Sequence, residues 1–186
     1  MKELQYLFNY VEFPEGCDEI YDVAGGAGDV AIALTLKAYI ERQPIKKATI
    51  VDPVSEFEKY SELIMNYMPF GKQLKEMVHF QEGVLQDLEF SQNAIVIAKH
   101  PCGDLADNLI ERWLNSDSPK LVIMTCCQGK AQDRNPRYGL SADEWKKLCK
   151  MSDWTNSQDP KKKTAWHGCD DRTGYKACRI FARSKC

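Results

Sequence analysis

Two uninterrupted apolar runs, at residues 94–98 and 121–124, constrain the fold of this chain more than any other feature. Strands that are apolar on both faces belong in the middle of a parallel sheet that helices cover on both sides. Three shorter strand-like segments precede these runs, at residues 18–24, 49–51 and 78–80. Between the segments, apolar residues recur at helical spacing. The alternation predicts an α/β fold built on a doubly wound, mostly parallel sheet.

The carboxyl-terminal part of the chain leaves this alternation. Ser141, followed three residues later by Glu144, predicts the start of a helix. Two further strand-like segments, at residues 164–169 and 175–182, are separated by a turn-forming sequence and predict an antiparallel hairpin. With five parallel strands before it, this hairpin gives an expected seven-stranded sheet, and residues 1–186 are expected to form a single domain.

Composition narrows the class of protein. The chain has 186 residues, of which 44% are hydrophobic and 28% charged, as in an ordinary globular protein. Its longest apolar runs, such as Val30–Leu34, are far shorter than the roughly 20 residues needed to cross a bilayer, so no membrane association is expected. The first residues lack the apolar core of a signal peptide. Eight cysteines without C-x-x-C spacing favour reduced thiols, which predicts a cytoplasmic or nuclear location.

Charge is unevenly distributed along the chain. Residues 1–127 carry 11 lysines and arginines against 20 acidic residues, whereas residues 128–186 carry 14 against 7. The basic part either faces an anionic partner or neutralises the rest of the fold. Its basic residues, among them Lys130 and Arg134, are interleaved with aromatic ones, which suits either an RNA backbone with an unstacked base or a solvated loop. Because the net charge is −2, RNA binding is expected to need either a partner subunit or recognition of the substrate's shape.

A glycine-rich turn joins the first strand to the first helix, and Asp29, directly after the turn, is placed to favour the start of that helix. Residues 22–28 have the sequence Asp-Val-Ala-Gly-Gly-Ala-Gly. Glycines let the backbone approach a ligand closely, and the amides at a helix start suit a carboxylate or a phosphate. A G-x-G-x-x-A pattern from Gly26 onward matches the dinucleotide fingerprint, with Asp52 placed for a ribose hydroxyl. However, the carboxylate of Asp22 would repel a pyrophosphate and could instead hold the ammonium group of an amino-acid moiety.

The same turn, taken as Asp22-x-Ala24-x-Gly26-x-Gly28, resembles motif I of the class I S-adenosylmethionine (SAM) methyltransferases, with Ala24 in place of the first glycine. This resemblance implies a Rossmann-like fold and SAM as the cofactor. It also implies that Asp87, after the third strand, takes the adenine amino group, and a solvated turn residue is the alternative. The cofactor-binding residues that follow from the resemblance are Asp22, Ala24, Gly25, Gly26, Ala27, Gly28, Asp52, Pro53, Asp87, Leu88 and Lys99.

The segments that follow the two apolar runs are more specific than the glycine turn. Residues 99–107 are Lys-His-Pro-Cys-Gly-Asp-Leu-Ala-Asp, and residues 125–130 are Thr-Cys-Cys-Gln-Gly-Lys. They resemble the K-H-x-C-G-x-x-x-D and T-C-C-H-H signatures of the eukaryotic tRNA acceptor-stem 2′-O-ribose methyltransferases, and also a wider group of methyltransferase-like proteins. Gln128-Gly129 stands where those tRNA enzymes have two histidines. The resemblance spans about residues 18–186 and implies RNA, in particular tRNA, as the substrate.

Two adjacent residues are the candidate catalytic ones. His100 could accept the proton of a ribose hydroxyl, because histidine has a reference pKa near working pH. Lys99 could act as a positioned cation, or as the base if desolvation favours its neutral form. One alternative is that His100 only orients its loop through a backbone hydrogen bond, and another is that Lys99 pairs with Asp104 or Asp107. The predicted substrate-binding residues are Cys102, Cys127, Gln128, Lys130 and Arg134.

A metal site is not predicted. Cys102, Cys126 and Cys127 could gather near His100 and suit zinc, but no pair of ligands has the usual spacing of about two to four residues. The function expected from the sequence is therefore methyl transfer from SAM to RNA by in-line displacement. The rival functions are a methyltransferase for a protein or small molecule, a SAM-binding module without catalysis, and an NAD(P)-linked oxidoreductase, which Asp22 disfavours.

Overall fold

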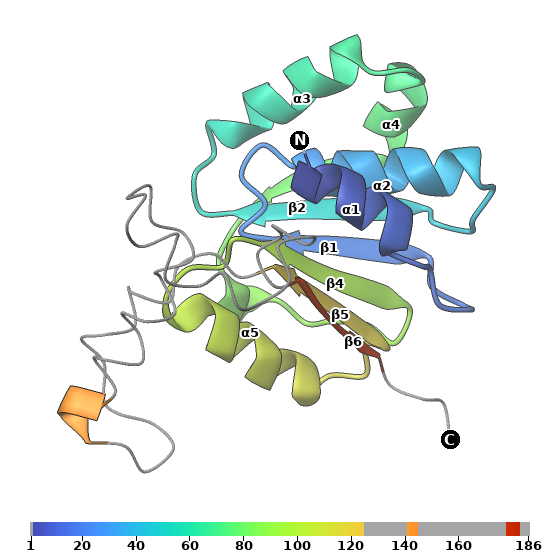
Figure 1. The fold of residues 1–186 in the computed structure, drawn as a ribbon. Helices are drawn as coiled ribbons and strands as arrows, with labels where there is room; N and C mark the ends of the chain where they lie inside the picture. Colours follow the sequence, from blue (N-terminus) through green and yellow to red (C-terminus); the bar gives the residue numbers. More distant parts are fainter. Residues whose placement is uncertain (1, 125–140, 145–177, 183–186) are drawn as a thin grey trace, which may run out of the picture.

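A computed structural model of the protein describes residues 2–124, 141–144 and 178–182. Within this part, one six-stranded sheet has the strand order β3-β2-β1-β4-β5-β6. Strands β1 to β5 run parallel, and β6 pairs antiparallel with β5 (Figure 1). The strands are β1 (Glu19–Val23), β2 (Lys47–Asp52), β3 (Val78–Glu82), β4 (Ala94–Lys99), β5 (Lys120–Met124) and β6 (Cys178–Ala182). The helices are α1 (Lys2–Tyr10), α2 (Asp29–Ile40), α3 (Phe57–Tyr67), α4 (Gly71–Met77), the 3₁₀ helix η1 (Leu85–Asp87) and α5 (Asp104–Leu114).

The predicted parallel strands are all present, and each bound lies within two residues of its expected position. The antiparallel β6 falls inside the second strand of the expected hairpin. The other hairpin strand, at residues 164–169, lies outside the described residues, and the seven-strand count with it. The helix start at Ser141 is confirmed, because its hydroxyl donates to the Glu144 carboxylate at 2.6 Å and accepts from the Glu144 amide at 3.4 Å.

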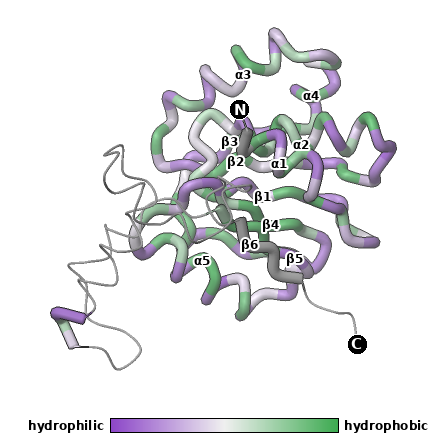
Figure 2. Tube along the Cα trace, in the orientation of Figure 1, coloured by the Kyte–Doolittle hydropathy of each residue, from purple (hydrophilic) through white to green (hydrophobic). Residues whose placement is uncertain are grey.

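The sheet is the middle of three layers. Helices α1 to α4 lie on one face and α5 lies on the other (Figure 1). Alternate residues of each central strand enter the two cores: in β4, Ile95 and Ile97 pack toward the first face, and Val96 and Ala98 toward the second. The central strands are accordingly hydrophobic along most of their length (Figure 2). Burial on both faces explains why the apolar runs are continuous.

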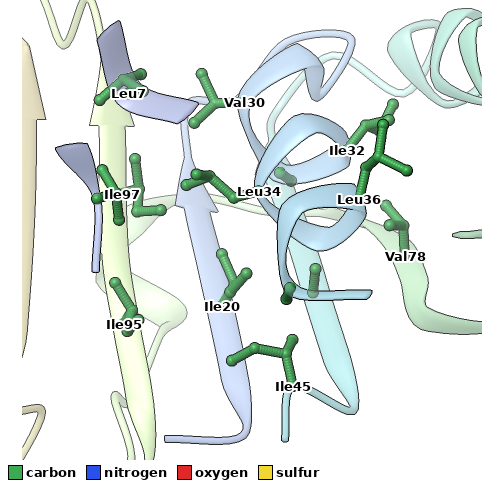
Figure 3. Packing of buried hydrophobic residues seen from close by; sticks show 14 of the residues in the cluster. Leu7, Ile20, Val30, Ile32, Leu34, Leu36, Ile45, Val78, Ile95 and Ile97 are labelled. Atoms are coloured by element: carbon green, nitrogen blue, oxygen red, sulfur yellow. The ribbon is translucent and has the colours of Figure 1, made fainter. Parts of the chain in front are cut away.

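Helix α2 is buried on all its sides, whereas the sequence indicated a single apolar stripe. Residues 30–38 are all buried. The reason is α1, which packs over the outer side of α2 and contributes Leu7 to the same cluster as Val30 and Ile97 (Figure 3). A helix covered on every side is expected to be apolar all round. Neither α1 nor α4 was predicted from the sequence.

Two buried lysines fasten the end of α1 to the rest of the fold. The ammonium of Lys37, on α2, donates to the carbonyl of Val11 at 2.8 Å. The ammonium of Lys120, at the start of β5, donates to the carbonyl of Glu12 at 2.6 Å. Burial lowers the pKa of Lys120 from its ordinary value. Each ammonium satisfies a carbonyl that follows α1, and both hydrogen bonds are charge-assisted.

The sheet has a switch point between β1 and β4. These strands are neighbours although β2 and β3 intervene in the chain. In open α/β sheets, ligands bind at the carboxyl ends of the strands, next to such a point. The segments singled out in the sequence follow β1, β2 and β4, so their described residues lie at that edge. No helix in the described ranges is both long and apolar enough to cross a membrane.

Candidate functional site

The turn after β1 is a tight bend with little room on one side. Ala24, Gly26 and Gly28 have φ values of 54°, 53° and 73°, in the left-handed region. A Cβ at Gly28 would lie 2.1 Å from the Ile50 Cδ1 atom, and a Cβ at Gly25 would lie 2.9 Å from the Ile50 Cγ2 atom. At Gly26, nothing lies within 4 Å of the corresponding position. The bend therefore packs its backbone against β2 and leaves open space beside Gly26.

Asp52, at the end of β2, holds this bend in place. One of its carboxylate oxygens accepts from the amide of Gly26 at 3.0 Å, and the other accepts from the amide of Val54 at 3.0 Å. The residue is 7% exposed. Each oxygen has a further lone pair, so Asp52 can still accept from a ribose hydroxyl, and that contact stays a prediction.

Asp22 lies beneath the bend. It is fully buried, and its Oδ2 accepts from the amide of Ala31 in the first turn of α2 at 3.0 Å. Its Oδ1 has no hydrogen-bond partner among the described residues. Burial raises the pKa of Asp22 to about 7; the Ala31 amide and Lys99 oppose this shift, whereas the carboxylates of Asp29 and Asp52 add to it. Asp22 therefore supports the start of α2, and its expected contact with a ligand ammonium stays a prediction.

Lys99 reaches from the end of β4 to the start of α2. Its ammonium forms an ion pair with the carboxylate of Asp29, the first residue of α2. The side chains are 23% and 39% exposed. Asp104 and Asp107 were the alternative partners expected for Lys99 from the sequence, but the ion pair in the structure is with Asp29. This contact brings the Lys-His segment against the cofactor turn, although the two are 70 residues apart.

His100 occupies an unusual backbone conformation beside Lys99. Its φ is 61°, which few residues other than glycine adopt. Its amide donates to the carbonyl of Met124, the last residue of β5, at 2.8 Å. The backbone hydrogen bond weighed as an alternative therefore exists, and the role of the imidazole stays a prediction. Such strained conformations cluster at functional sites.

The remaining predicted site residues fall into two groups. Asp87 and Pro53 are exposed, Cys102 is half-buried, and Leu88 is 3% exposed within the core under α5. Cys127, Gln128, Lys130 and Arg134 lie outside the described residues. In the part of the chain that the structure describes, no three His, Cys, Asp or Glu side chains are grouped so as to hold a metal ion.

One site residue was assigned too small a role from the sequence. Asp29 was interpreted only as an acid favourable to the start of a helix, whereas the structure makes it the partner of Lys99. The signal in the sequence was its position directly after Gly28, the last glycine of the turn.

The charges and donors at this edge fit the groups of SAM better than a dinucleotide. Asp29 pairs with Lys99, and Asp29, Asp52 and Lys99 all lie close enough to Asp22 to influence its pKa. This surplus of carboxylates suits a cationic ligand and opposes a pyrophosphate. Among the described residues, the amides of Asp29 and Val30 donate to no acceptor, so they can serve a ligand carboxylate.

Comparisons with known proteins agree with this geometry. Residues 2–134 match a family model described as "Methyltransferase domain". No curated protein is significantly similar to the chain in sequence.

Among solved structures, the YcgJ protein from Bacillus subtilis has a TM-score of 0.53 and 11% identity, over 97% of this chain and 94% of that one. A geranyl diphosphate methyltransferase in complex with SAM has a TM-score of 0.51 and 14% identity, over 79% of this chain and 55% of that one. A methylase of a ribosomal protein from Lactobacillus delbrueckii subsp. bulgaricus has a TM-score of 0.41 and 18% identity, over 66% of this chain and 58% of that one. The chain thus spans little more than half the length of the last two. At these identities the first two likenesses concern the fold alone, which is Rossmann-like.

Proposed function

This chain belongs to the methyltransferase domain family, and we propose that it transfers the methyl group of SAM to an RNA, with the ribose 2′-hydroxyl of a tRNA as the leading acceptor. The domain is a SAM-dependent methyltransferase domain. The observation that carries the proposal furthest is the ion pair between Lys99 and Asp29, because it joins the Lys-His segment after β4 to the glycine bend after β1.

The cofactor would lie along the carboxyl edge of β1, β2 and β3. The open side of Gly26 leaves room for its amino-acid moiety, beside the amides of Asp29 and Val30, which donate to no acceptor among the described residues. Asp52 already orients the bend and would accept from the ribose hydroxyls. The exposed Asp87 would accept from the adenine amino group. Leu88 is part of the core, so it would shape the adenine site through its backbone.

The chemical step needs little more than positioning and a base. SAM supplies a methyl group on a sulfonium that is already activated for displacement. A ribose hydroxyl is a weak nucleophile, so removing its proton as the oxygen attacks lowers the barrier. We assign this role to His100, whose left-handed backbone and bond to Met124 fix it at the end of β4. With SAM bound, the hydroxyl oxygen would take the methyl group as its bond to the sulfonium breaks, and the imidazole of His100 would take the hydroxyl proton.

The choice of RNA as substrate rests on the resemblance of residues 99–107 to the tRNA enzymes and on charge. The part of the chain that follows residue 127 is rich in lysine and arginine, and the part before it is acidic. Because the net charge of the chain is −2, we propose that a partner subunit contributes further phosphate contacts and that the protein works in the cytoplasm or nucleus.

The test is an incubation of the full chain with SAM labelled in its methyl group, with bulk tRNA in one reaction and a protein extract in the other. We expect label in tRNA. After alkaline hydrolysis the label should stay in dinucleotides, because a methylated 2′-oxygen cannot attack the neighbouring phosphate. Label in mononucleotides would redirect the proposal to a base, and label in protein alone would refute an RNA substrate. Thermal unfolding with SAM or NAD checks the cofactor, since only a bound ligand stabilises the fold.

A further inference from the structure

We propose that Asp29 is a positioning residue of this site: its carboxylate holds the ammonium of Lys99 at the start of α2, where that ammonium binds the carboxylate of the methionine moiety of SAM. The inference rests on the proposed function and adds to it a residue that the sequence had marked only as a favourable helix start. It also assigns Lys99 to the cofactor, which leaves proton transfer to His100.

The position of the ion pair supports this role. Asp29 directly follows Gly28, so the pair sits at the exit of the bend that leaves open space beside Gly26. The amides of Asp29 and Val30, which donate to no acceptor in the described part of the chain, belong to the same turn. An ammonium has three donors, and Asp29 engages Lys99 without exhausting them. A ligand carboxylate at this place would therefore meet a cation and two amides together.

The surrounding charges explain why Lys99 needs a partner of its own. Its ammonium and the carboxylates of Asp29 and Asp52 all lie close enough to Asp22 to influence the pKa of that residue. The buried carboxylate of Asp22 accepts from the amide of Ala31. The carboxylate of Asp52 accepts from the amides of Gly26 and Val54. Asp29 is the acid of this group that contacts Lys99 directly. Removing its charge would free the lysine side chain to swing toward solvent, since a long flexible stem gains rotamer entropy.

The test compares two ligands that differ in the part of the cofactor that Lys99 would bind. S-adenosylhomocysteine carries the amino-acid moiety, whereas 5′-methylthioadenosine has the same nucleoside thioether without it. Affinities are measured by calorimetric titration for the wild type, Asp29→Asn, Lys99→Met and the double variant. Asp18→Asn is the matched control, because it breaks the Lys46–Asp18 ion pair, in which the lysine is 77% exposed, outside the site.

We expect Asp29→Asn to weaken S-adenosylhomocysteine roughly tenfold, the size of one charge-assisted hydrogen bond, and to leave 5′-methylthioadenosine within about twofold. Lys99→Met should weaken the same ligand at least as much, and adding Asp29→Asn to it should change nothing further. Asp18→Asn should bind both ligands as the wild type does. If Asp29→Asn does not fold, Asp29→Ser replaces it, because serine is well tolerated at a helix start and carries no charge.

Three results would overturn the inference. Equal weakening of both ligands by Asp29→Asn would mean that the residue only supports the fold of the bend. Unchanged affinity for both would make the ion pair a surface contact. Additive losses in the double variant would show that Asp29 does not act through Lys99. In each case the wild type still binds S-adenosylhomocysteine, so the proposed function stands; a wild type that binds neither SAM nor S-adenosylhomocysteine would refute both.

Discussion

Gly28 is where the cofactor bend is least tolerant of a side chain, and Gly28→Ala therefore tests the packing of the bend directly. The residue has a φ of 73°, and an added Cβ would lie 2.1 Å from the Ile50 Cδ1 atom and 2.6 Å from its Cγ1 atom. Gly26 is the matched control, because its φ is 53° and nothing lies within 4 Å of the same position.

The magnitude follows from separating the two costs. Alanine in the left-handed region costs about 1–2 kcal/mol at either glycine. Forcing an extra carbon into a packed core costs about 1–3 kcal/mol more, and only at Gly28. We therefore expect Gly28→Ala to lower the free energy of unfolding by about 1–3 kcal/mol more than Gly26→Ala does. Against a total of about 5–15 kcal/mol, this difference is readily measured.

Urea denaturation, extrapolated linearly to water, measures both variants, and calorimetric titration measures their affinity for SAM. Gly26→Ala should stay folded but bind SAM more weakly, because its methyl group enters the open space. Ile50→Val removes the nearest clashing carbon, so in combination with Gly28→Ala it should cost less than the two single changes together. Equal destabilisation by the two alanine variants, or strict additivity with Ile50→Val, would refute this account of the bend.

Three further outcomes are expected. Burial raises the pKa of Asp22 to about 7, so the folded state holds a proton that the unfolded state loses near pH 4. The free energy of unfolding should therefore fall as pH rises between about 4 and 7. Asp22→Asn should flatten that part of the pH profile, which urea titrations at stepped pH measure. Lys120→Met removes the buried ammonium that binds the carbonyl of Glu12 after α1, so it should lower the free energy of unfolding by about 1.5–3 kcal/mol. Amide hydrogen exchange should then speed up in α1 at conditions where β4 is still protected. Lys46→Met, at an exposed lysine, is the control and should have neither effect. His100→Gln should slow methyl transfer about 10²–10⁴-fold at unchanged SAM affinity. His79→Gln, at an exposed residue of β3, is the control and should keep full turnover. Full turnover of His100→Gln would remove His100 from the mechanism.

Much of the fold could be predicted because it depends on neighbours in the chain. The apolar runs of β4 and β5 reflect burial on both faces, and that pattern is visible in any strand covered by two layers. The capping box of Ser141 and Glu144 is likewise local, spanning four residues. Helix α1 was not predicted, because it is held by tertiary packing on α2, through residues such as Leu7 and Val11, that local sequence does not reveal.

Of the candidate site, likewise, the part that depends on neighbours in the chain could be predicted, and the part that depends on tertiary contacts could not. The glycines of the bend predicted a close approach of the backbone to its neighbours or to a ligand, because their spacing and their place after a strand are properties of the sequence. That Asp22 lies beneath the bend and accepts from the amide of Ala31 depends on the packing of α2 above it.

The order of the residues alone determined which segments become the parallel strands and where the backbone needs glycines to turn, because side-chain periodicity and backbone freedom belong to a few consecutive residues. The tertiary structure decided which of these turns meet. Lys99 finds Asp29 only because β4 lies next to β1 in the sheet, and a pairing between strands so far apart in the chain is chosen by the packing of the whole core.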